Sequence, residues 1–242
     1  VAYKALGITQ AICTPFSYIA TAGSLAWEKI PTSFVDIDSH SLNLCPSLVD
    51  KKLEGSSDFD SIIATHVYGN PCAVESFDNL SSKYNVKVIY DAAHAFGVRY
   101  GEKSLLSYGD ASTLSFNATK VFHTIEGGAI IFKENEVYEK AKQLINFSID
   151  SNGTPTGAGI NAKLNEYQCA VGLTLLDNID SILDHRRRIF NEYTRLLESS
   201  VELPKWNENT SLTNGSYFPI ILENELEKKR IKTLLDGYDI PC

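Results

Sequence analysis

The sequence has 242 residues, 43% of them hydrophobic, so the chain is long enough to bury a substantial core. Its formal net charge of -8 argues against a broad nucleic-acid surface, because phosphate binding depends on clustered Lys and Arg. No apolar run approaches the ~20 residues that span a bilayer, and no secretory signal pattern opens the sequence. We therefore expect a soluble, cytoplasmic protein with neither a nucleic-acid nor a membrane partner.

Five cysteines are widely spaced along the chain, at Cys13, Cys45, Cys72, Cys169 and Cys242. None belongs to a Cys-x-x-Cys pair of the kind that binds zinc or forms a redox dithiol. We expect reduced thiols and no metal site. The single basic cluster, at residues 186–188, falls in a helix-like stretch and is expected to be a solvated helical face.

Short runs rich in β-branched residues alternate with helix-length segments, a pattern typical of a mostly parallel sheet. Between the third and fourth runs, apolar residues recur at helical spacing and predict a helix with one buried stripe. This arrangement is a βαβ unit, and ligands of such sheets collect at the carboxyl ends of the strands. Strands are expected at residues 11–14, 33–37, 61–66, 86–90, 111–116 and 129–132.

The second half of the chain is predicted to be mainly helical. A helical pattern at 134–146 is followed by a polar, Gly-rich loop at 148–159, and helices are expected at 163–176 and 179–197. A strand-like run at 217–222 and a charged helix after it resemble the start of a smaller domain. Because both ends break off in mid-pattern, we expect the complete protein to be longer.

These elements predict an α/β fold with three layers, α/β/α, around a mostly parallel sheet. Residues 1–178 are expected to form a large ligand-binding domain. Residues 179–242 are expected to form a linker helix and part of a small C-terminal α/β domain.

Two charged residues stand at the ends of successive predicted strands. Asp91 ends the strand at 86–90 and is followed by small residues, a setting in which a carboxylate can hold a positive charge such as a protonated pyridine nitrogen. Lys120 follows the next strand, where desolvation lowers the pKa of an amine and favours Schiff-base chemistry. Asp91 alone would more often cap a helix, and Lys120 alone would more often be a surface lysine. Pyridoxal phosphate requires both groups.

Six short motifs extend this pattern. They are TPFSYIAT at 14–21, FVDID at 34–38, YDAAHAFG at 90–97, SFNATK at 115–120, EGG at 126–128 and GINAK at 159–163. In this order they resemble the motifs of the DegT/DnrJ/StrS family of nucleotide-sugar aminotransferases, which have the fold of the pyridoxal-phosphate aminotransferases. The run at 122–128 is most similar to enzymes that act at C4 of a dTDP-4-keto-6-deoxyhexose.

The resemblance implies a role for each of six residues. Lys120 would bind pyridoxal 5'-phosphate as a Schiff base and then act as general acid and base, and Asp91 would keep the pyridine nitrogen protonated. Four further residues would hold the cofactor: His94 near its phenolic oxygen, Tyr18 against the ring face, Ser115 at the phosphate, and Asn161 at the cofactor phosphate of the neighbouring subunit. The last role implies a homodimer with shared active sites.

The implied activity is transfer of an amino group from glutamate to a nucleotide-linked, dTDP-type 4-keto-6-deoxyhexose, in amino-sugar biosynthesis for O-antigen or another surface polysaccharide. A 3-keto-sugar aminotransferase of the same family and a non-catalytic regulatory protein with the same fold are the alternatives. Lys120 argues against the related sugar dehydratases, which carry histidine at that position. A nicotinamide enzyme is disfavoured because no Gly-x-Gly-x-x-Gly follows any predicted strand.

Overall fold

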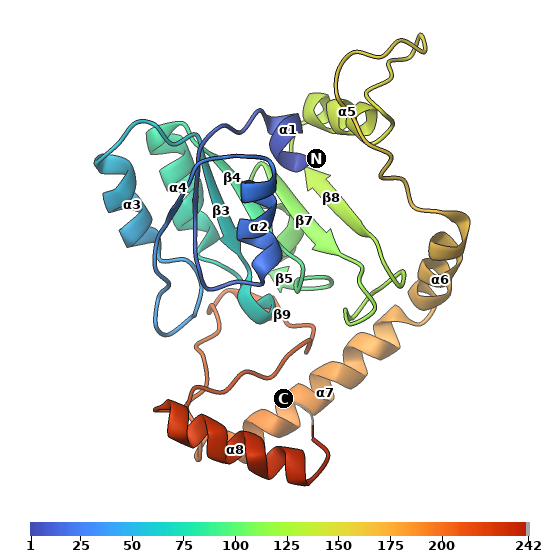
Figure 1. Cartoon of the computed structure of the whole chain (residues 1–242). Helices are drawn as coiled ribbons and strands as arrows, with labels where there is room; N and C mark the ends of the chain where they lie inside the picture. Colours follow the sequence, from blue (N-terminus) through green and yellow to red (C-terminus); the bar gives the residue numbers. More distant parts are fainter. Residues whose placement is uncertain (241–242) are drawn as a thin grey trace.

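A computed structural model describes residues 1–240 and is built around a six-stranded sheet (Figure 1). The strand order is β2-β1-β3-β4-β7-β8, and every pair of neighbours is parallel except β7 and β8, which are antiparallel. The predicted mostly parallel sheet is therefore confirmed. The strands are β1 (Ala11–Cys13), β2 (Thr32–Phe34), β3 (Ser61–Thr65), β4 (Lys87–Asp91), β7 (Ala111–Ser115) and β8 (Gly128–Phe132).

Helices cover both faces of this sheet, as the three-layer prediction requires (Figure 1). Strand β3 shows the reason, because all of its residues are buried and alternate residues enter different cores. Ile62 packs in the core beneath α3 (Pro46–Glu54) and α4 (Val74–Tyr84). Ile63 packs in the core shared with α1 (Ala2–Leu6) and α2 (Ile19–Trp27).

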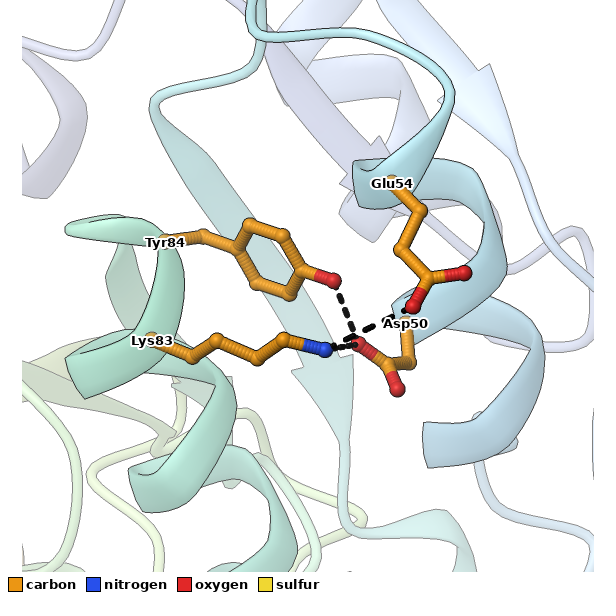
Figure 2. Close-up of polar contacts among 4 residues, drawn as sticks. All are labelled: Asp50, Glu54, Lys83 and Tyr84. Carbon is orange, nitrogen blue, oxygen red and sulfur yellow. Dashed lines mark hydrogen bonds and ion pairs between the residues drawn. The ribbon is translucent and has the colours of Figure 1, made fainter.

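Helices α3 and α4 are also joined at the surface by a polar cluster (Figure 2). The Lys83 Nζ lies 2.9 Å from the Asp50 Oδ1 and 3.6 Å from the Glu54 Oε1. The Tyr84 hydroxyl donates a second hydrogen bond to the same Asp50 oxygen, at 2.7 Å. Because these groups are exposed to water, they stabilise the helix pair less than the apolar core beneath them.

Beyond the sheet, α5 (Asn135–Leu144) packs against α1, and α6 (Glu166–Leu176) leads into the long α7 (Ile179–Leu197). A small antiparallel sheet joins the end of the chain to its middle, since β9 (Thr210–Leu212) pairs with β5 (Arg99–Tyr100), which pairs with β6 (Lys103–Ser104). The last helix is α8 (Glu225–Gly237), and single 3-10 turns lie at Val67–Gly69 and Leu105–Ser107.

The strand predicted at 217–222 is wrong. In that run only Ile221 pairs, through an isolated bridge to Glu202, and the nearby strand is β9 instead. Residues 217–222 are held in place by side-chain packing and not by the backbone hydrogen bonds of a sheet. The Tyr217 ring packs on His94 with centroids 4.5 Å apart, whereas the Phe218 ring packs on Phe190 of α7 at 5.2 Å.

No helix within residues 1–240 is both long and apolar enough to cross a bilayer. Cys13, Cys45, Cys72 and Cys169 are free thiols. The fifth cysteine considered in the sequence, Cys242, lies outside the described residues.

A buried histidine follows β3. His66 is fully buried, its ring stacks on Tyr90 at 4.5 Å, and its Nδ1 accepts a hydrogen bond from the Cys72 N–H at 3.0 Å. Burial lowers the pKa of His66 from 6.5 to about 3. The unfolded chain therefore takes up a proton as the pH falls below 6.5, while the folded chain does not, so folding stability decreases through this range.

We expect the free energy of unfolding of the wild-type chain to decrease between about pH 7 and about pH 5 by on the order of 2 kcal/mol more than that of a His66→Phe variant. Phenylalanine keeps a ring against Tyr90 and does not titrate. Urea unfolding at both pH values measures the difference. The exposed His185→Phe is the matched control and should keep the wild-type pH dependence. Parallel loss of stability in the wild type and His66→Phe would contradict the assignment.

Candidate active site

A cavity of about 1350 Å³ opens at the carboxyl ends of β4 and β7, where ligands of parallel α/β sheets bind. Its wall combines apolar strand residues with a few polar groups. Five of the six residues predicted for the site line this one cavity: Tyr18, Asp91, His94, Ser115 and Lys120. Asn161 does not line it.

Asp91 is the last residue of β4, and both of its carboxylate oxygens are held. The Thr21 hydroxyl donates a hydrogen bond to Oδ2 at 2.5 Å, and the Ala93 N–H donates to Oδ1 at 3.1 Å. A helix does not follow Asp91, because the chain turns through residues 92–97 into β5. The helix-cap alternative is therefore wrong, and the carboxylate lies at the cavity.

Lys120 is half-buried in the turn between β7 and β8. Its backbone N–H donates a hydrogen bond to the Asn117 backbone carbonyl at 2.9 Å. Burial lowers the pKa of the Lys120 amine, and the nearby Asp91 carboxylate opposes this effect. A lowered pKa increases the fraction of neutral, nucleophilic amine at a given pH.

Hydrogen bonds within the 116–128 turn fix the position of Lys120. The Asn117 Nδ2 donates to the Glu126 Oε1 at 2.7 Å, and the Thr124 hydroxyl donates to the Glu126 carbonyl at 2.7 Å. Gly127 has φ 153°, and a Cβ there would lie 2.4 Å from the Thr124 Oγ1. The EGG motif is thus explained locally, since a side chain at Gly127 would force this turn open.

His94 is half-buried in the loop after Asp91. Burial, together with the nearby Lys120 charge, lowers its pKa to about 4, with Asp91 opposing, so the ring is neutral at neutral pH. Its Nδ1 is buried and has no hydrogen-bond partner within residues 1–240. The loop itself is held by Asn214, whose Nδ2 donates to the carbonyls of His94 at 2.7 Å and Phe96 at 2.9 Å.

An aromatic pair flanks the His94 ring. Tyr68 stacks on it at a centroid distance of 6.4 Å, and Tyr217 lies tilted at 4.5 Å; both line the cavity. Tyr217 was not predicted as a site residue, because a strand was expected there. Thr21 was likewise assigned no role, although it lies three residues after Tyr18, at a spacing that places residues on one side of a helix.

Ser115 and Tyr18 line the cavity from β7 and α2. Ser115 ends β7, and its Oγ accepts a hydrogen bond from the Asn117 N–H at 3.3 Å, which leaves the hydroxyl proton free to donate. Tyr18 is the N-cap residue of α2 and is 75% exposed. Its ring face is therefore open to a planar ligand.

Asn161 lies apart from these residues. It is exposed and forms an isolated bridge with Asn146, close to the loop after α5. The next residue, Ala162, does line the cavity. Asn161 is thus exposed and contributes no atom to the cavity of its own chain.

The chain is similar in sequence and in fold to known aminotransferases. The model of the DegT/DnrJ/EryC1/StrS aminotransferase family matches residues 1–241. A dTDP-4-amino-4,6-dideoxy-D-glucose transaminase from Shigella dysenteriae is 39% identical over 234 residues, which are 95% of this chain and 62% of the relative. A transaminase of the same name from Escherichia coli is 34% identical, with 95% and 62% covered.

Among solved structures, the crystal structure of DesI in the presence of its TDP-sugar product superposes with a TM-score of 0.88 at 28% identity. The match covers 98% of this chain and 61% of DesI. The chain belongs to the DegT/DnrJ/EryC1/StrS aminotransferase family, as the ordered motifs predicted. It spans 62% of the length of the two curated transaminases.

Proposed function

We propose that the protein is a pyridoxal-phosphate-dependent aminotransferase that moves an amino group from glutamate to C4 of a dTDP-linked 4-keto-6-deoxyhexose. The observation that carries the proposal is the meeting of Asp91 and Lys120 in one cavity, with the pKa of Lys120 lowered by burial. The two curated transaminases support the dTDP sugar and position C4. We place the product in amino-sugar biosynthesis for O-antigen or a similar surface polysaccharide.

The cavity residues fit this cofactor. Asp91 offers a held carboxylate for a protonated ring nitrogen, and the Ser115 hydroxyl can donate to a phosphate oxygen. Tyr18 presents an open ring face, and the neutral His94 lies in the same wall. When bound, pyridoxal phosphate supplies an electron sink for the substrate carbon next to the nitrogen.

The chain's own residues would then divide the work. The Lys120 amine would hold the cofactor covalently and, once free, would serve as the general acid and base for the proton at the substrate carbon. Asp91 holds the proton at the ring nitrogen, which keeps the ring electron-poor. Tyr18 would cover one ring face, and His94 would lie near the phenolic oxygen.

We also propose a homodimer in which Asn161 of one subunit reaches the cofactor phosphate held by the other. Two features support this proposal: Asn161 is exposed, and it does not line the cavity that holds Lys120 of its own chain. Within each subunit we propose a large domain at 1–178 and a smaller region at 179–242.

Two alternatives remain distinct from this proposal. A 3-keto-sugar aminotransferase would use the same cavity residues and differ only in the carbon that receives the amine. A non-catalytic regulatory protein would have no need of a desolvated lysine in the same cavity as a held carboxylate, so the presence of both Lys120 and Asp91 favours an enzyme.

Product analysis tests the function directly. The full-length protein, loaded with pyridoxal phosphate, is incubated with dTDP-4-keto-6-deoxyglucose and glutamate, and the sugar product is examined by NMR. We expect an amine at C4 of the hexose. An amine at C3 of a 3-keto isomer, with no reaction of the 4-keto sugar, would establish the first alternative. The absence of cofactor binding together with the absence of any aminated sugar would contradict the proposal.

A further inference from the structure

A buried threonine is bonded to the carboxylate of the site. Thr21 is 4% exposed, and its hydroxyl lies 2.5 Å from the Asp91 Oδ2 although the two residues are 70 positions apart. An ionised carboxylate can only accept hydrogen bonds, so the hydroxyl is the donor. The distance falls in the short range typical of hydroxyl donors to a charged acceptor.

With this bond, both oxygens of the Asp91 carboxylate accept a hydrogen bond from the chain. The Ala93 N–H holds the Oδ1 at 3.1 Å and Thr21 holds the Oδ2, so each oxygen has one donor from its own chain and the plane of the carboxylate is fixed. Each oxygen retains acceptor capacity toward the cavity, which both Asp91 and Thr21 line. Thr21 also belongs to the first turn of α2, which begins at Ile19 directly after Tyr18, so its backbone is anchored by a helix.

We propose that Thr21 is a positioning residue that orients Asp91 toward the ring nitrogen of the cofactor. The inference depends on the proposed function, because it concerns the contact between Asp91 and a protonated pyridine. Thr21 contributes the direction of the acceptor lone pair, and the charge comes from Asp91. Loss of the hydroxyl leaves the Oδ2 without its donor from the chain and frees the carboxylate to rotate about its side-chain bonds.

Two ligands that differ only at the ring nitrogen can test the contact between Asp91 and that nitrogen. Pyridoxal phosphate and its 1-deaza analogue, in which carbon replaces the ring nitrogen, share the ring, phosphate, phenol and aldehyde. Their affinities for the cofactor-free, full-length protein are measured by equilibrium dialysis, and the ratio of the two dissociation constants reports the ring-nitrogen contact alone. We expect the wild type to prefer pyridoxal phosphate and Asp91→Asn to lose most of that preference.

Thr21→Val keeps the shape of the side chain and removes the hydroxyl. We expect it to reduce the preference for pyridoxal phosphate about tenfold, the scale of one hydrogen bond to a charged group. Thr21→Ser, which keeps the hydroxyl, should restore the preference. If Thr21→Val does not fold, Thr21→Ala provides the same comparison, and its fold is checked by circular dichroism.

The outcomes separate this inference from the proposed function. A wild type that prefers pyridoxal phosphate, with Thr21→Val keeping that preference, would overturn the role of Thr21 and leave the function standing. Equal weakening of both ligands in Thr21→Val would also overturn it, since that result indicates general packing. A wild type that binds neither ligand, or binds both equally, would contradict the cofactor contact of Asp91 itself.

Discussion

Replacing Lys120 with alanine is expected to abolish amino transfer by the full-length protein while leaving the fold intact. The amine is chemically necessary, whereas the half-buried side chain contributes little packing. Lys120→Arg should be equally inactive, because a guanidinium stays protonated and cannot act as the nucleophile. Product formation measures the loss of activity, and circular dichroism measures the intact fold. Visible absorption measures the loss of the lysine-bound cofactor.

The matched control is Lys103→Ala. Lys103 is an exposed residue of β6 outside the cavity, so this variant should keep wild-type turnover and absorption. Near-native turnover in Lys120→Ala, with the control behaving as expected, would remove Lys120 from the mechanism.

Mixing two inactive variants is expected to restore activity. If Asn161 serves the neighbouring site, Lys120→Ala and Asn161→Ala homodimers each lack an essential residue at both sites. After subunit exchange, mixed dimers contain one site with both residues intact, so an equimolar mixture should recover about a quarter of the wild-type activity. Activity is followed during exchange, and sedimentation establishes that exchange has taken place.

Two results would contradict the shared site. A fully active monomer would do so, as would a mixture that remains inactive after demonstrated exchange. Mixing Lys120→Ala with a Lys120→Arg partner is the matched control, because no combination of these subunits contains an intact site.

Much of the fold was predictable from local sequence patterns. Strands that are buried on both faces carry consecutive apolar residues, as β3 does at 62–64, and α4 carries an apolar stripe at helical spacing. The run at 217–222 misled because a short, continuous run of aromatic and branched apolar residues normally indicates a strand. Here Tyr217 and Phe218 pack on two separate aromatic surfaces, and only Ile221 has a backbone partner.

The site was predictable where residues share a strand end or a motif. Asp91 and Lys120 follow adjacent strands of the sheet, and parallel strands bring their carboxyl ends to one edge. The bonds from Thr21 and Asn214 were not predictable in the same way. They join positions 70 and 120 residues apart, and neither periodicity nor spacing carries information about such pairs.

The Asn214 bonds also bear on when the site is completed. Contacts between residues that are distant in sequence require closure of a long loop, and they therefore tend to form late in folding. During synthesis, the ribosome adds more than a hundred residues after His94 before Asn214 can bind the carbonyls of its loop. The Asp91 strand can enter the sheet earlier, whereas the final conformation of the His94 loop waits for the C-terminal segment. The cavity wall around His94 is therefore completed only after the C-terminal segment has been synthesised.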